Sequence, residues 1–177
     1  MAFSRQYELS EVKGMLQIYR NNHAITNVDA NTGAITRSNA GAHAHIHGES
    51  SFLDQRARVN TPGEPRTTGT YWNSDDQARA TLEILNSGTG QTALQDLDNG
   101  QSNTVIQTAL TLNTYRYAAA SDASNLGPNV PGHVGRNNQA RIGAGSNHSQ
   151  GYATQGFVKV VKGVGGLMQI QTSYPIA

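Results

Sequence analysis

The C-terminal end of the chain carries the pattern that most restricts its fold. Residues 157–161 are a run of strand-forming side chains, and residues 167–174 alternate in the manner of a second strand. Between them, residues 162–166 (Lys-Gly-Val-Gly-Gly) have the composition of a tight turn. The sequence therefore predicts a C-terminal antiparallel β-hairpin.

Helical patterns come earlier in the chain. Residues 8–21 place apolar side chains at helical spacing, with Ser10 as the expected N-cap. Residues 75–85 repeat the pattern behind a capping segment, and residues 92–97 predict one or two further turns. A fourth stretch, residues 50–58, begins with a serine as the expected cap and continues with good helix formers, so we expect a helix there as well.

Further strands and one long loop fill the remainder. Residues 24–28 and 33–36 predict a small hairpin or an irregular leader, and strands are expected at 70–72 and within 104–117. The Gly-, Asn- and Ser-rich residues 118–155 predict a long loop with one strand near 140–144. Helices first and antiparallel strands afterwards indicate the α+β class. We expect N-terminal helices packed on a twisted antiparallel β-sheet that ends in the C-terminal hairpin.

Composition narrows the possible functions. The 177 residues suit one domain, and the absence of cysteine excludes disulfides and thiolate metal sites. A net charge of +1 gives no global basic field, so nucleic-acid binding would have to rest on a local patch. No run approaches the roughly 18 apolar residues of a membrane-spanning helix, and residues 1–6 lack the features of a signal peptide. We therefore expect no membrane partner.

A histidine cluster is the first candidate for chemistry. His43, His45 and His47 stand at alternate positions, and Glu49 and Arg56 follow. Imidazole titrates near neutrality, so the cluster predicts either metal binding or proton transfer.

The metal-binding alternative has a partial motif. His43, His45 and Glu49 resemble the first motif of the cupin barrels. The later cupin motif is only partly matched at residues 131–133, and Arg37 stands where the pattern expects glycine. A cupin-like metal protein stays an alternative, as does a non-catalytic binding domain whose histidines are surface features.

The second candidate chemistry for the histidine cluster is proton transfer during RNA cleavage. Cleavage through the neighbouring 2′-hydroxyl needs a base for that hydroxyl, an acid for the 5′-oxygen and a cation or donors for the phosphorane. Histidine suits the proton steps, and the planar fork of arginine suits the phosphate.

The histidine stretch is also similar to a segment of the RNase A-like toxin domains, which occur at the C-termini of bacterial contact-dependent inhibition and other polymorphic toxins. The family segment reads His-Val-Gly and then Leu-x-x-Arg. With His45 on the family histidine, Leu53 and Arg56 fall at the matching positions. The glycine follows His47 instead, so His47 is an alternative to His45, with Arg58 then eleven residues further on.

Two later features follow in the family's order. Residues 69–72 with Ala78 resemble a Ser-Thr-Phe-like element before a helix, and residues 172–175 (Thr-Ser-Tyr-Pro) resemble the family's terminal Thr-Ala-Tyr/Phe-Pro strand. The resemblance implies a leader over residues 1–40, a toxin domain over 41–177 and a fold of the barnase-EndoU-colicin-RelE type.

The resemblance also implies an activity and its partners. The activity is a ribonuclease that needs no metal and no cofactor and leaves a 2′,3′-cyclic phosphate. The chain would be a monomeric part of a larger secreted effector, acting on RNA in the cytoplasm of a target bacterium. A cognate immunity protein would block the site.

The resemblance implies roles for the residues that stand at the family's site positions in this sequence. His45 would be the general base or acid, Arg56 the phosphate-binding cation and Thr172 a hydrogen-bond donor to the phosphate. Tyr174 would stack on a base or take part in proton transfer, on the same strand face as Thr172. Substrate binding would involve Lys159, Trp72 and Arg58. The plainer interpretations are an ordinary strand face for Thr172 and Tyr174, a solvated edge for Lys159 and a core position for Trp72 and Tyr71.

Overall fold

The computed structural model of the chain describes residues 2–22, 25–28, 35–37, 48, 67–122, 146–163 and 166–176. Within this part, three helices accompany two three-stranded antiparallel sheets and a small hairpin, which confirms the α+β class. The sequence predicts a single sheet, whereas the described strands form two. The boundary that we expect at residue 40, and the helix expected over residues 50–58, lie outside the described residues.

The first helix, α1 (Leu9–Asn22), confirms the prediction for residues 8–21. Its start differs from the expected one, because Ser10 lies within the first turn. The carbonyl of Glu8 accepts from the backbone N–H of Glu11 and Val12, and the Glu11 carboxylate accepts in return from the N–H of Glu8. Glu8 thus precedes the helix, and the Glu11 carboxylate supplies the returning half of a capping box, whereas Ser10 is two residues too late to be the N-cap.

Two consecutive helices form the centre of the chain. Helix α4 (Ser74–Asn86) begins behind Asn73, whose side chain accepts from the N–H of Asp76, as the capping segment predicted. Helix α5 (Gly88–Asp98) is longer than the one or two turns expected, because the Ser87 hydroxyl caps it by accepting from the N–H of Gly90. A β-carbon at Gly90 would overlap the last carbonyls of α4, so the close approach of the two helices requires glycine there.

The first sheet has the order β4-β7-β8 and contains β4 (Asn103–Ala109), β7 (Gln155–Lys162) and β8 (Met168–Ile176). Strands β7 and β8 form the predicted C-terminal hairpin. Helices α4 and α5 pack on one face of this sheet, where their apolar side chains meet those of the strands. The fully buried members of this core include Ile84, Leu94, Leu97, Ile106, Val158, Val160 and Ile170.

The second sheet has the order β3-β5-β6 and contains β3 (Thr67–Tyr71), β5 (Arg116–Asp122) and β6 (Ser146–Tyr152). The single strand region expected within 104–117 is therefore divided into β4 and β5, with the buried Leu110 and Tyr115 in the connection between them. The loop expected over 118–155 contains the rest of β5, all of β6 and the start of β7. The strand expected near 140–144 lies outside the described residues.

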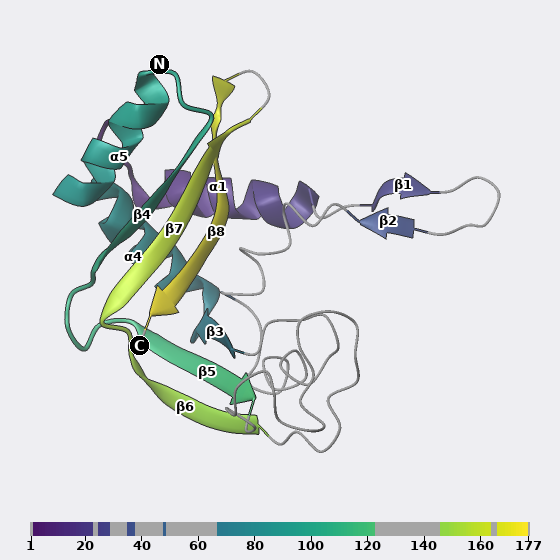
Figure 1. Cartoon of the computed structure of the whole chain (residues 1–177), viewed down its shortest axis with the longest axis vertical. Coiled ribbons are helices and arrows are strands. Elements are labelled where there is room, and N and C mark those ends of the chain that lie inside the picture. Colours follow the sequence, from purple (N-terminus) through teal and green to yellow (C-terminus); the bar gives the residue numbers. More distant parts are fainter. Residues whose placement is uncertain are drawn as a thin grey trace, which may run out of the picture.

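The predicted N-terminal hairpin is present as β1 (Ile25–Val28) and β2 (Ile35–Arg37), which pair antiparallel. Figure 1 shows it at the far end of α1 from the sheets. None of the described helices is long and apolar enough to cross a membrane.

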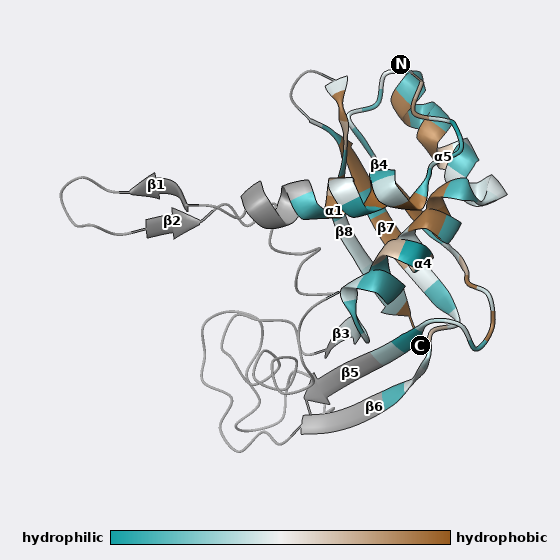
Figure 2. Cartoon of the chain, turned by 180° about the vertical axis from the view of Figure 1, so that it is seen from behind, coloured by the Kyte–Doolittle hydropathy of each residue, from teal (hydrophilic) through white to brown (hydrophobic). Residues whose placement is uncertain are grey.

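Helices and strands form separate layers around the first sheet. Figure 1 shows α1 and α4 behind β4, β7 and β8, and the reverse view in Figure 2 shows these helices in front of the strands. Hydrophobic residues follow β7 in Figure 2, in agreement with the buried side chains of that strand. No described helix lies on the opposite face of the sheet, and that face holds the residues considered next.

Candidate functional site

The face of the β4-β7-β8 sheet that points away from α4 and α5 carries three of the residues singled out in the sequence. Phe157 pairs with Tyr174, and Lys159 pairs with Thr172. Directly opposed residues of antiparallel strands point to the same side, and the alternating Val158 and Val160 are buried on the helix side. We call the four residues Phe157, Lys159, Thr172 and Tyr174 the outer face. The prediction that Thr172 and Tyr174 share one strand face is thereby confirmed.

Thr172 is buried, and its hydroxyl forms no hydrogen bond with any described residue. The register of the β7–β8 pair shifts immediately beyond it, between Lys159 and Val160. Such bulges re-aim side chains and recur near functional sites. The Thr172 hydroxyl is therefore a buried donor that no described residue satisfies.

Tyr174 stacks on Phe157, with ring centroids 4.7 Å apart and an angle of 17° between the ring planes. Burial raises the pKa of the Tyr174 phenol above its ordinary value. A phenol with a raised pKa remains protonated at neutral pH, so Tyr174 can donate a hydrogen bond and is a poor proton acceptor. The stack on Phe157 also holds its ring in place.

Lys159 lies beside Thr172 on the outer face and is half-buried. Within the described part of the chain, no carboxylate forms an ion pair with its ammonium group. Among the described residues, its charge beside Thr172 is therefore not neutralised by an ion pair. This position differs from the solvated edge considered in the sequence analysis, because β7 is the central strand of its sheet.

The histidine segment contributes one described residue, Gly48, and this residue is helical and buried. A β-carbon at position 48 would overlap the side chain of Gln77 on α4. Gln77 is fully buried, and its amide donates to the backbone carbonyl of Ser173 at 3.0 Å. One side chain therefore connects the residue after His47 to the strand that carries Thr172 and Tyr174.

Sequence reasoning missed Gln77. A glutamine at a position where α4 faces the core is the available signal, because buried amides need partners. Nothing in the sequence indicates that the partners lie on β8 and beside residue 48.

The remaining predicted site residues lie outside the described residues: His43, His45, His47, Glu49, Arg56 and Arg58. Their positions relative to the outer face stay predictions. Among the described residues, no group of three or more His, Asp or Glu side chains is placed to hold a metal ion.

Trp72 follows β3 and is 47% exposed, so the core interpretation is wrong for Trp72, whereas it is confirmed for the fully buried Tyr71. The guanidinium carbon of Arg116 lies 4.2 Å from the centroid of the Trp72 ring, a cation–π contact.

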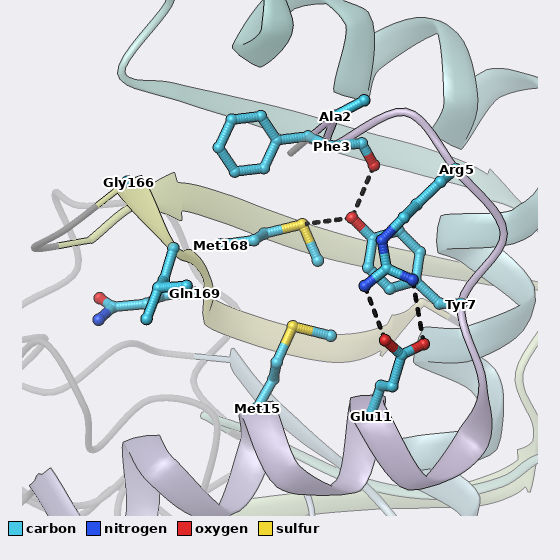
Figure 3. Close-up of a pocket in the computed structure, with 10 residues that line it drawn as sticks. Ala2, Phe3, Arg5, Tyr7, Glu11, Met15, Gly166, Met168 and Gln169 are labelled. Carbon is cyan, nitrogen blue, oxygen red and sulfur yellow. Dashed lines mark hydrogen bonds and ion pairs between the residues drawn. The ribbon is translucent and has the colours of Figure 1, made fainter.

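A separate pocket of about 270 Å³ lies at the other end of β8. Phe3, Met15 and Met168 supply much of its apolar wall, and the Arg5–Glu11 ion pair, with an N–O distance of 2.7 Å, forms a polar side (Figure 3). Met168 and Tyr174 are six residues apart, or about 20 Å along an extended strand, so this pocket is distinct from the outer face. Its described charges neutralise each other, and the hydroxyl of Tyr7 donates to the carbonyl of Phe3.

No protein-family model matches the sequence, and no curated protein matches it. Among solved structures, the chain is similar to a "CdiA-CT/CdiI complex from Y. kristensenii 33638", with a TM-score of 0.47 and 11% sequence identity over 76% of this chain and 100% of that chain. At this level the likeness assigns neither a family nor a function.

Proposed function

We propose that the protein is a metal-independent endoribonuclease toxin that cleaves RNA by attack of the 2′-hydroxyl and leaves a 2′,3′-cyclic phosphate. The observation that carries the proposal is the outer face, where a buried hydroxyl without a described partner, a lysine and a phenol lie together on the side of the sheet that points away from α4 and α5. These groups match what a phosphodiester in reaction needs, which is hydrogen-bond donors and positive charge.

The proposed mechanism assigns proton transfer, phosphate binding and substrate binding to different residues. His45, or alternatively His47, removes the proton of the 2′-hydroxyl or supplies one to the 5′-oxygen. Arg56 binds the phosphate oxygens, and Thr172 donates a hydrogen bond to the same group as charge develops on it. Tyr174, held neutral by burial, stacks on a base or donates a hydrogen bond. Lys159, Arg58 and Trp72 bind the substrate.

The contact chain from Gly48 through Gln77 to Ser173 supports this division. It places the residue that follows His47 against the helix that holds β8.

The toxin role rests on the sequence resemblance. Residues 45–56 and the terminal 172–175 follow the order of the RNase A-like toxin domains. We infer that the chain is the monomeric toxic part of a larger secreted effector, that it acts in the cytoplasm of a target bacterium, and that a cognate immunity protein covers the outer face.

Two alternatives remain to be tested against this proposal. A cupin-like metal protein would use His43, His45 and Glu49, but the two described sheets are open and three-stranded rather than closed into a barrel. A non-catalytic binding domain would use the same surfaces without turnover.

The test is incubation of the purified protein with total RNA in excess EDTA. We expect cleavage that is lost in Arg56→Gln and in His45→Ala. Loss in His47→Ala with retention in His45→Ala would move the catalytic histidine by two residues. Intact RNA under these conditions, or cleavage only after metal is restored, would overturn the proposal.

A further inference from the structure

Two large aromatic side chains of the described structure are exposed far beyond what packing requires. Trp72 and Tyr152 are each 47% exposed, whereas the other tyrosines and phenylalanines whose burial the structure describes are buried or half-buried. Burying an aromatic side chain stabilises a protein strongly, so two that stay in solvent at one location call for a function.

Strand pairing places these two residues on either side of one arginine. Arg116 is the register partner of Tyr152, and the N–H of Trp72 donates to the carbonyl of Arg116 at 3.0 Å. The register of β3 and β5 pairs Tyr71 with Tyr117, which puts Trp72 opposite Arg116 one residue further on. Opposed residues share a face of the sheet, and Arg116 lies over the Trp72 ring. The three form a cross-strand row, which we call the Trp72–Arg116–Tyr152 ladder.

We propose that this ladder is a binding platform for single-stranded RNA, on which bases stack while Arg116 contacts a phosphate. Neighbouring strands are about 4.8 Å apart, so the ladder offers flat groups at intervals that successive unstacked bases can follow. Aromatic rings and guanidinium planes stack on bases of any sequence. This inference rests on the proposed ribonuclease function, because it names where the substrate is held beside the reacting phosphate.

The chain path connects the ladder to the outer face. Tyr152 ends β6, and β7 begins at Gln155, whose register partner is Ile176 at the end of β8. Tyr174 is two residues before Ile176, on the strand whose outer face carries Thr172. A strand of RNA a few nucleotides long can thus span from the ladder to the proposed reacting site.

One nearby charge opposes anion binding and provides a test. Asp76 on α4 is close enough to Arg116 for that cation to lower its pKa, although burial raises the pKa overall. Removing this carboxylate should make the field around Arg116 more positive. Asp76→Asn is therefore expected to tighten RNA binding.

The experiment uses the fluorescence of Trp72, the single tryptophan of the chain. The full chain is titrated with a short oligouridylate carrying 2′-O-methyl riboses, which cannot be cleaved through the 2′-hydroxyl. We expect quenching that saturates, with binding weakened about ten-fold or more in Arg116→Gln and in Tyr152→Ala. Tyr152→Phe should bind like the unchanged protein, and Asp76→Asn should bind more tightly.

Two controls complete the design. Leu167→Ala removes an exposed side chain at the β7–β8 turn, away from the ladder, and should leave binding unchanged. Trp72→Ala, followed by the anisotropy of a labelled oligonucleotide, should weaken binding as Tyr152→Ala does. Circular dichroism of each variant verifies that it is folded.

The outcomes separate this inference from the ribonuclease proposal. Saturable quenching that depends on Arg116 and Tyr152 supports the ladder even if total RNA stays intact. Cleavage of RNA without quenching, or quenching that the ladder variants leave unchanged, overturns the ladder and leaves the cleavage proposal standing.

Discussion

Two threonine hydroxyls at β8 differ in their hydrogen bonding, and the difference suggests a structural role for one and a functional role for the other. Thr81 on α4 donates to the carbonyl of Gln77 at 2.6 Å and lies 2.7 Å from the Ser173 hydroxyl. Thr172, on the other side of the strand, has no hydrogen-bond partner among the described residues. The first hydroxyl contributes to stability, whereas we propose that the second donates a hydrogen bond to the substrate.

Replacing each threonine by valine tests this assignment. Thr172→Val should change the free energy of unfolding by less than about 1 kcal/mol and lower RNA cleavage on the order of 10²-fold, the effect of losing one donor to a developing negative charge. Thr81→Val, the matched control, should destabilise the protein by about 1–3 kcal/mol without lowering kcat. The measurements are urea unfolding and initial rates on RNA. A Thr172→Val variant that loses stability but keeps its rate would make Thr172 a structural residue.

At the level of single residues, the sequence predicted features that depend on local spacing, but not features that depend on contacts between residues distant in sequence. The shared face of Thr172 and Tyr174 followed from their separation by two along a strand. The exposure of Trp72 did not, because a hydrophobic residue at a strand end is buried or exposed according to which strand pairs beside it. The role of Gln77 was not predicted either, because it depends on contacts with Gly48 and Ser173, which are both distant in sequence.

Among the elements, α4 connects the histidine segment to β8, and Gly48 is the described point of contact. The side chain of Gln77 occupies the space that a β-carbon at position 48 would need. Gln77 cannot move freely, because it is fully buried and hydrogen-bonded to the carbonyl of Ser173.

A double-mutant cycle at this contact tests whether the segment packs on α4. Gly48→Ala should destabilise the protein by about 1–3 kcal/mol through overpacking, and Gln77→Ala by a similar amount through its lost hydrogen bond. The double variant should be more stable than the sum predicts by about 1 kcal/mol, since the new methyl group enters the space that Gln77 leaves. Chemical denaturation measures all four proteins. Additivity within about 0.5 kcal/mol would mean that the two residues do not touch in solution.

The N-terminal segment is attached to the end of α5 through a carboxylate. Asp98 accepts from the backbone N–H of Phe3 at 2.6 Å and from the N–H and hydroxyl of Ser4 at 2.9 and 2.5 Å. The bond from the Phe3 N–H, followed by those from Ser4, lowers the pKa of Asp98. A group with a lowered folded-state pKa stabilises the fold above its unfolded-state pKa, and the contribution disappears as the pH falls through the folded value.

Comparing the unchanged protein with Asp98→Asn isolates this contribution. The unchanged protein should have the higher Tm at pH 6, and the difference should close as the pH falls below about 4, the ordinary range of an aspartate. Glu11 and Asp75 also have lowered pKa values, through Arg5 and Lys13, but they titrate in both proteins and cancel in the difference. A Tm difference that stays constant down to pH 2, or grows on acidification, would contradict the role of Asp98.

The elements that sequence predicted best are those with strong periodic or capping signals. Helices α1 and α4 and the β7–β8 hairpin have apolar side chains at regular spacing. Strands β5 and β6 consist largely of Ala, Ser, Asn and Gly, residues that are uncommon in strands. They form because β5 pairs on both sides, with β3 and β6, and no local pattern reports such tertiary pairing.

On the scale of the whole molecule, the chain path joins the two surfaces on which the proposals rest. Helices cover one face of the β4-β7-β8 sheet and leave the outer face without a described helix. The short connection from β6 to β7 brings the Trp72–Arg116–Tyr152 ladder next to the end of β8. The proposed function needs both surfaces, one for the reacting phosphate and one for the bases beyond it.

The most direct test of the central claim is the fate of an oligonucleotide that contains one ribonucleotide among 2′-O-methyl residues, incubated with the protein in EDTA. We predict a single cut on the 3′ side of the ribonucleotide, with a 2′,3′-cyclic phosphate identified by mass spectrometry, and no cut in the fully 2′-O-methylated control. Cleavage of that control, or an intact substrate at protein concentrations that bind it, would contradict the account.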